Sequence, residues 1–313
     1  MASSPVVASR NEGELRRAVA RLHVSTPHSA ASAAHVAAAW TIYAVAGVAA
    51  LQSSSLMLRL PLWFVMGWIL VGNGAMVHET LHGHLFASRR ANRAVGVVAG
   101  ATVGLPFSVY RSYHLGHHQY SCTKDDPEGL PYRFGSKLYY LLVPIGGPLF
   151  AVQFVWWTLR SIAGRPPVFV RSQRQRRAVV TDGLLGIAFY AAMVLLGLHS
   201  FEMLLALWLA PWLLAVVVLE PLVLIPEHYG AEEADAALAL RTTRTVRSNP
   251  LVGWVYWRNN LHTAHHVAPG AVPQDIATVS ATLVEPCLAP QWWASGYLAF
   301  HWQLLRRLPW RPE

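Results

Sequence analysis

The sequence predicts an all-α integral membrane protein, with about four transmembrane helices in two hairpins, re-entrant or interfacial helices between them, and a cytoplasmic cap rich in histidine. Three observations lead to this fold class. Of the 313 residues, 54% are hydrophobic and only 13% are charged, whereas soluble proteins average about 25% charged residues. Uncharged runs long enough to span a membrane recur along the chain. Fifteen histidines, almost as many as the sixteen acidic residues, gather in a few short motifs between those runs.

Cysteine content and charge exclude several classes of protein. Two cysteines, Cys122 and Cys287, are too few for a disulfide framework, a four-cysteine zinc site or a fused iron–sulfur electron-transfer module. The net charge of +9 is spread over short basic runs between apolar segments. That pattern is typical of cytoplasmic loops and lipid-headgroup contact. The expected partners therefore include the lipid bilayer and no nucleic acid.

The apolar runs and the basic loops together predict the topology. The basic stretch from Arg160 to Arg177 and the N-terminus are expected on the cytoplasmic side, so each hairpin leaves that side and returns to it. Two further runs must then begin and end on the cytoplasmic side, as re-entrant or surface-lying segments. The predicted crossings are Val36–Leu58, Leu60–Val77, Val179–Leu198 and Met203–Val218, and the two other runs are Ala94–Tyr110 and Leu138–Leu159.

Both ends of the chain are predicted to lie outside the bilayer core. Residues 1–34 form a polar cytoplasmic segment with a short helix around Arg16, Arg17 and Arg21, and they lack the apolar stretch of a cleavable signal peptide. Residues 35–313 form a single membrane domain. It ends in an amphipathic interfacial helix at about 291–310, which is rich in Trp.

Ten of the fifteen histidines lie in four places near the ends of apolar runs. The pattern HxxHH is expected by chance only about 0.03 times in a chain with this histidine content, and it occurs twice. On a helix, residues three and four apart share a face, so each motif directs two or three imidazoles toward one point. The four places are His78-Glu79-Thr80-Leu81-His82-Gly83-His84 (78–84), His114-Leu115-Gly116-His117-His118 (114–118), the lone His228, and His262-Thr263-Ala264-His265-His266 (262–266).

This concentration of imidazoles indicates a metal centre. Neutral imidazole binds iron, zinc, copper and nickel, and eight or nine histidines are too many for one ion but suit two. A dinuclear site with nearly all nitrogen ligands in a membrane indicates redox chemistry with oxygen. The predicted ligands are His78, His82, His114, His117, His118, His228, His262, His265 and His266.

Other interpretations account for less of the pattern. His78-Glu79-x-x-His82 matches the HExxH signature of zinc metalloproteases, but that reading leaves both HxxHH motifs unexplained. A metal or lipid transporter would carry its polar groups at mid-membrane, whereas these histidines lie at the ends of the runs. His84 falls on another helical face from His82 and is interpreted as a non-ligand. The isolated histidines are interpreted as structural or exposed: His23, His28, His35, His199 and His301.

The three histidine motifs resemble those of the membrane fatty acid desaturase superfamily, which carries HxxxH or HxxxxH followed by two HxxHH boxes. His78/His82, His114/His117/His118 and His262/His265/His266 match these boxes in order, and the likeness covers about Leu60 to Val272. Asp125-Asp126-Pro127-Glu128 after the second box and Asn259-Asn260 before the third agree with it. The segment Glu227–Gly230 also resembles alkane hydroxylases of the same wider superfamily.

The resemblance implies two iron ions, O2 as co-substrate and electrons from a separate protein such as a ferredoxin, a rubredoxin or a cytochrome b5-like protein with its reductase. It implies a desaturase that introduces a double bond into an acyl or lipid chain. The alternative on the same scaffold is a hydroxylase or ketolase of an alkane, a carotenoid or a specialised metabolite. The partition between these outcomes depends on how the chain is held near the oxidant.

Several polar residues beside the motifs are predicted to support the ligands. A metal-bound imidazole usually donates its second N–H to a carboxylate or carbonyl, and Glu79, Asp126 and Glu227 are placed to accept it. Asn260 is predicted to hold a metal-bound water. Glu220, near the end of an apolar run, is expected either to pair with an arginine such as Arg244 or to face the active site.

Overall fold

The computed structural model describes residues 12–21, 25–128, 134–231 and 238–311. The described chain is helical apart from one short parallel strand pair, in which Thr245 lies opposite Trp293 and Val246 opposite Ala294. The predicted all-α membrane class is confirmed, since the long helices are apolar enough to cross a bilayer. The helices are α1 Glu12–Arg21, α2 Ser29–Gln52, α3 Leu56–His82, α4 Arg89–Val103, α5 Phe107–Tyr120, α6 Lys137–Leu142, α7 Gly146–Ile162, α8 Gln173–His199, α9 Phe201–Leu204, α10 Ala210–Leu214, α11 Glu220–His228, α12 Ala239–Thr242, α13 Pro250–Val255, α14 His262–Val267, α15 Pro273–Val279 and α16 Tyr297–Arg307, and the strands are β1 Thr245–Val246 and β2 Trp293–Ala294.

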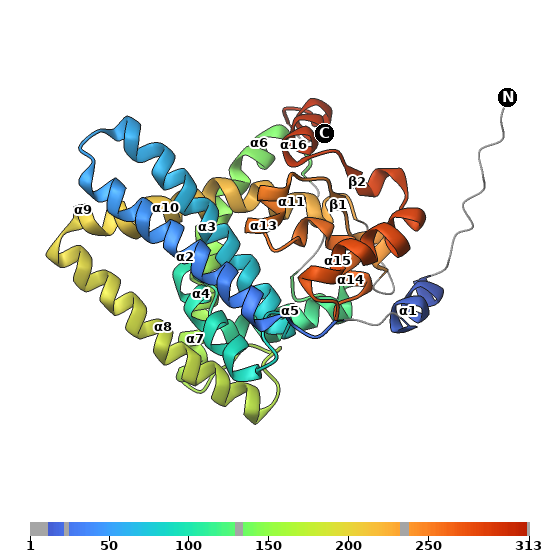
Figure 1. The fold of residues 1–313 in the computed structure, drawn as a ribbon, viewed down its shortest axis with the longest axis horizontal. Coiled ribbons are helices and arrows are strands. Elements are labelled where there is room, and N and C mark those ends of the chain that lie inside the picture. The colour runs from blue at the N-terminus through green and yellow to red at the C-terminus, as the bar shows by residue number, and fades with distance from the viewer. Residues whose placement is uncertain (1–11, 22–24, 129–133, 232–237, 312–313) are drawn as a thin grey trace.

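Both predicted hairpins are present. Helices α2 and α3 run side by side in opposite directions, and α8 turns back at Ser200 into α9 and the helical segments that follow it (Figure 1). Within the described residues, five segments are long and apolar enough to span a membrane: Ser29–Gln52, Leu56–His82, Lys137–Ile162, Gln173–His199 and Phe201–His228. Four of them correspond to the four predicted crossings. The fifth, Lys137–Ile162, contains the run expected to begin and end on one side, and its length and composition also suit a crossing.

The helix boundaries differ from the predicted ones for local reasons. The first turn falls at 53–55, where three consecutive serines separate α2 from α3, so the residues from Leu56 onward belong to the second helix. The run at 94–110 is broken, because α4 ends at Gly104 and Pro106 precedes α5. Gly104 has φ +85°, and a Cβ there would lie 2.6 Å from the Ala151 Cβ. The two helices meet at 96°, a geometry that fits either a broken span or a re-entrant segment.

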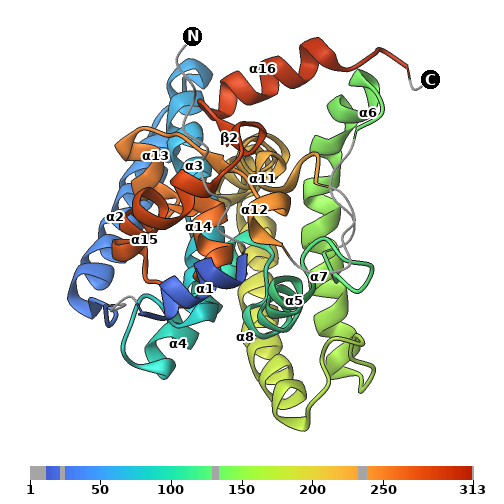
Figure 2. The same ribbon diagram turned by 90° about the vertical axis from the view of Figure 1, so that its right-hand side faces the viewer.

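The two largest of three hydrophobic cores in the described residues position the histidine motifs. The larger core packs residues of α3, α4 and α5 against α7, α8 and the last span. The smaller core joins α14 and α15 to Leu15 of α1, so the N-terminal helix packs on the cap. Helix α16 crosses the top of Figure 2 toward α6, and His301 joins it to Tyr140 of α6 by a hydrogen bond. The histidine motifs lie where the two cores adjoin, at the ends of α3, α5 and α11 and along α14.

Candidate metal centre

The last turn of α3 carries the first pair of histidines. His78 and His82 lie one turn apart and therefore share a helix face. The helix ends at Gly83, whose φ of +87° lets its backbone N–H cap the carbonyls of Glu79 and Thr80. His78 is buried and His82 is partly exposed. Because the helix stops at Gly83, both rings lie in its last turn.

Helix α5 supplies three histidines that divide between two directions. His114 and His118 are four residues apart and point toward His78 and His82, with ring centroids 4.6 Å apart for His78 and His114. His117 points in another direction, toward His228, and the centroids of these two rings are 4.8 Å apart. One short helix therefore contributes to both sides of the centre.

The remaining histidines come from α11 and α14. His228 is the last residue of α11, and His262, His265 and His266 make up half of the six-residue helix α14. Trp257 and Arg258 precede α14 with φ of +51° and +61°, a conformation unfavourable for bulky side chains. No sequence pattern predicts this turn, which sets the direction in which the third motif enters the centre.

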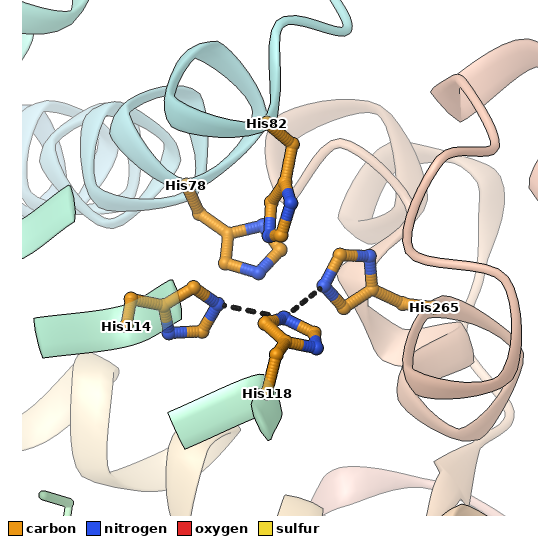
Figure 3. Close-up of side chains that lie close together, drawn as sticks. All are labelled: His78, His82, His114, His118 and His265. Carbon is orange, nitrogen blue, oxygen red and sulfur yellow. Dashed lines mark hydrogen bonds between the residues drawn. The ribbon is translucent and has the colours of Figure 1, made fainter. Parts of the chain in front are cut away.

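The nine predicted ligands come together in two adjoining groups. In the first histidine group, His78, His82, His114, His118 and His265, the potential ligand atoms lie within 4.8 Å of one another. Figure 3 shows His118 between His114 and His265, with His78 and His82 entering from α3. The second histidine group consists of His117, His228 and His266, which meet the same limit, and His262, whose Nε2 lies 2.9 Å from the Nε2 of His228. The rings of His118 and His266 stack across the boundary, 4.4 Å apart.

The spacing of the nitrogens fits metal ions between them. The Nε2 of His118 lies 3.0 Å from that of His114 and 2.9 Å from that of His265. Imidazole nitrogens bind first-row metals at about 2.1 Å, so two ligands at right angles lie about 3 Å apart. Among the described residues, four buried Nε2 atoms have no hydrogen-bond partner: those of His78, His82, His117 and His266. Buried polar atoms are normally satisfied, and a metal ion would satisfy these.

Carboxylates hold the outer nitrogens of several rings. The Nδ1 of His78 donates to Glu79 at 2.9 Å, and the Nδ1 of His117 donates to Asp126 at 3.0 Å. Glu227 is different, because its Oε1 accepts from the Tyr256 hydroxyl and its Oε2 lies 3.7 Å from His262 Nδ1. The Asn260 amide donates to the Val246 carbonyl and thereby links the third motif to β1.

Two further ligand-holding groups were missed by the sequence analysis. The Nδ1 of His114 donates to Glu128 at 3.0 Å. Glu128 was noted only as part of the motif after the second box, and its position two residues after Asp126 was the available signal. The Nδ1 of His228 donates to the main-chain carbonyl of Thr242 at 2.8 Å. A carbonyl carries no side-chain signature, so nothing in the sequence could have identified it.

His84 lies beside the first histidine group with both ring nitrogens occupied. Its Nδ1 contacts Glu79 Oε2 at 2.8 Å and its Nε2 contacts the Pro269 carbonyl at 3.1 Å. Both partners are hydrogen-bond acceptors, and they engage both ring nitrogens away from the first histidine group. Glu79 is thus shared between His78 and His84. This geometry supports the interpretation of His84 as a non-ligand.

Burial keeps the α14 rings in the form that binds metals. Removal from solvent, together with the neighbouring imidazoles, holds the pKa of His262, His265 and His266 well below its usual value. Burial also raises the pKa of Glu128 to about 7, an effect that His117 opposes and Asp126 reinforces. Only deprotonated imidazole has a free lone pair, so the third motif can accept a metal ion at neutral pH.

A small cavity opens beside both histidine groups. Its volume is about 90 Å³, and apolar and aromatic side chains such as Leu105, Phe150 and Leu224 form part of its wall. Glu220 also lines it. Arg244 does not pair with Glu220, because its guanidinium donates to the carbonyls of Pro226, Tyr229 and Gln291. Glu220 therefore lines the cavity beside the histidines and is not paired with Arg244.

The isolated histidines lie away from the two groups. His35 stacks on Trp254 and Trp257, and His301 accepts from Tyr140 and donates to the Leu222 carbonyl. His199 is exposed at the far end of α8. His28 precedes α2 as its N-cap residue. His23 lies outside the described residues.

Comparison with known proteins agrees with the geometry. The family model described as Fatty acid desaturase matches residues 54–294, which contain all four histidine motifs. The chain is also 24% identical over 274 residues to the sn-1 oleoyl-lipid 12-desaturase of Picosynechococcus sp., an alignment that covers 80% of this chain and 75% of that protein.

Proposed function

The chain belongs to the fatty acid desaturase family of oxidoreductases, and from that premise we propose that it introduces a double bond into the acyl chain of a membrane lipid. The observation that carries the proposal is the pair of adjoining histidine groups with unpartnered, inward-facing nitrogens. The cyanobacterial relative acts on an oleoyl lipid by its name, which supports a lipid-bound chain as the substrate class. The balance is one –CH2–CH2– unit, O2, two electrons and two protons giving –CH=CH– and two waters.

We assign one iron ion to each histidine group. The first histidine group would supply His78, His82, His114, His118 and His265, and the second His117, His228, His262 and His266. When bound, the iron pair would supply the activation of O2 that removal of hydrogen from an unactivated carbon requires. Zinc cannot replace it in this role, because zinc has no redox chemistry.

The protein's own part is to hold the rings and exclude water. Glu79, Asp126 and Glu128 fix three rings through Nδ1 and leave the Nε2 atoms directed inward. Such support typically changes metal affinity 10–100-fold. The apolar wall of the cavity would hold a chain segment against the centre, and the position of that segment decides which hydrogens are removed.

The electron donor and the membrane orientation complete the proposal. Within the described residues the free cysteines are Cys122 and Cys287, so electrons would come from a separate ferredoxin, rubredoxin or cytochrome b5-like protein with its reductase. The histidine groups would face the cytoplasm, because the C-terminal end of α3 lies on the same side of the molecule as the arginine-rich start of α8 (Figure 1).

The test is mass spectrometry of lipids from a host that expresses the protein. We expect a product lighter by two hydrogens, which disappears in His118→Ala because that ring lies between His114 and His265. The matched control is His199→Ala, an exposed histidine at the far end of α8, which should behave as the parent. A product heavier by one oxygen would instead assign the protein to the hydroxylase or ketolase branch and refute desaturation.

A further inference from the structure

Glu220 lies within a candidate membrane-spanning segment. It is the first residue of α11 and lies in the apolar span Phe201–His228. His228 lies eight positions further along the chain, or about 12 Å along the helix. Ionisable residues at membrane depth are unfavourable, and where they occur they usually serve a function.

The other acids around the cavity already have partners. Glu128 accepts from His114, and Glu227 accepts from Tyr256. At the opposite end of the same span Glu202 pairs with Arg59 at 2.6 Å. Within the described part of the chain, the carboxyl of Glu220 has no hydrogen bond or ion pair. Glu220 therefore differs from Glu202 and Glu227 of the same span, because both of these acids have a partner within the described residues.

The surroundings of Glu220 direct it toward a ligand. It lines the cavity that His78, His117 and His228 also line, and Leu224, one turn further along α11, adds to the apolar wall. A proton relay would need a connected donor or acceptor beside the carboxyl, and a structural role would need a partner within the protein. A substrate group that enters the cavity could form the hydrogen bond to the carboxyl, and this needs neither a proton relay nor a partner within the protein.

We propose that Glu220 binds a hydrogen-bond donor on the substrate, so that the chain bound beside the histidine groups carries a hydroxyl or an amino group rather than being an unsubstituted hydrocarbon. This inference rests on the proposed function, because it assigns the same cavity to the substrate. A carboxyl accepts such a bond whether it is neutral or ionised. The bond discriminates against a chain that lacks the group, because the carboxyl is then left unpaired in the protein interior.

Binding of a matched series of probes tests the proposal without turnover. The holoprotein in detergent micelles is equilibrated with dodecane, 1-dodecanol or dodecylamine, and the bound amount is measured by gas chromatography against empty micelles. We expect the wild type to bind dodecanol about tenfold more tightly than dodecane, the value of one hydrogen bond in an apolar site. Tighter binding of dodecylamine than of dodecanol would assign the substrate an amine, and tighter binding of dodecanol would assign a hydroxyl.

Three variants isolate the carboxyl. Glu220→Leu should abolish the preference for dodecanol, whereas Glu220→Gln should retain most of it because its amide oxygen still accepts. Glu202→Leu removes a carboxylate at the other end of the same span and should leave the preference unchanged. Equal binding of dodecane and dodecanol by the wild type, or a preference that persists in Glu220→Leu, would overturn the proposal.

Iron content, measured on the same samples, separates this inference from the proposed function. Wild-type protein without iron would contradict the di-iron assignment, while the probe preference would still report on Glu220. Wild-type protein with two iron ions and no preference would leave the desaturase proposal intact and refute the role of Glu220.

Discussion

The two histidine groups adjoin each other but are held in place by different means. In the first histidine group, the carboxylates of Glu79 and Glu128 hold two of the five rings, and His82 and His118 are partly exposed. In the second histidine group all four rings are buried, and Asp126 and the main-chain carbonyl of Thr242 hold two of them. The first histidine group is therefore more open to solvent. The position of the second histidine group depends in part on a main-chain contact rather than on side chains alone.

Removal of one ring from each group is the strongest test of this division. His82→Ala and His228→Ala should each lower activity by more than about 100-fold, because each removes a proposed ligand. Each variant should lose about one of the two iron ions per chain, as measured by metal analysis of purified protein. Loss of both ions from either variant would show that the groups form a single cooperative site.

Weakening the outer hydrogen bonds gives the next largest effect. Glu79→Gln and Asp126→Asn keep the size of the side chain but remove the charge that the ring N–H contacts. We expect iron affinity to fall 10–100-fold, with Glu79→Gln acting on the first histidine group and Asp126→Asn on the second. Competition with a chelator measures this, and an unchanged affinity in both variants would refute the supporting role of these carboxylates.

Exchange of iron with solvent should distinguish the groups in the unmodified protein. A water-soluble chelator should remove one iron ion several-fold faster than the other, because the first histidine group contains the two partly exposed rings. The time course of iron release, followed by absorbance of the chelate, should therefore show two phases. A single phase would contradict the difference in access.

A buried histidine outside both groups should have the smallest effect on the site. His301→Ala leaves the Tyr140 hydroxyl and the Leu222 carbonyl without their partner, so we expect a loss of about 2 kcal/mol in stability. Iron content should remain at the parental value. The midpoint of thermal unfolding and metal analysis on the same preparation check both expectations, and a loss of iron would place His301 in the centre after all.

The difference between the groups also explains what could be predicted from sequence. Helical spacing predicts the two pairs of the first histidine group, His78 with His82 and His114 with His118, because each pair is one turn apart. The second histidine group requires His228, which has no histidine neighbour in the sequence and reaches its place through the end of α11. Its support by Thr242 depends on a main-chain atom. Such contacts between distant segments produce no sequence pattern from which they could be predicted.

The fold shows the same limit. Composition and the lengths of apolar runs predicted the helical membrane class and both hairpins. Whether Lys137–Ile162 crosses the bilayer was not decided by hydropathy, because an interfacial helix and a crossing helix can share length and composition. The positive φ angles of Trp257 and Arg258 come from packing around α13 and α14, which local preferences do not encode.

Metal analysis of the purified wild-type protein tests the central claim most directly. Two histidine groups, one holding each ion, predict two iron ions per chain by plasma mass spectrometry, with zinc far below stoichiometric amounts. One zinc ion per chain and no iron would contradict the account and favour the metalloprotease reading of His78-Glu79-x-x-His82.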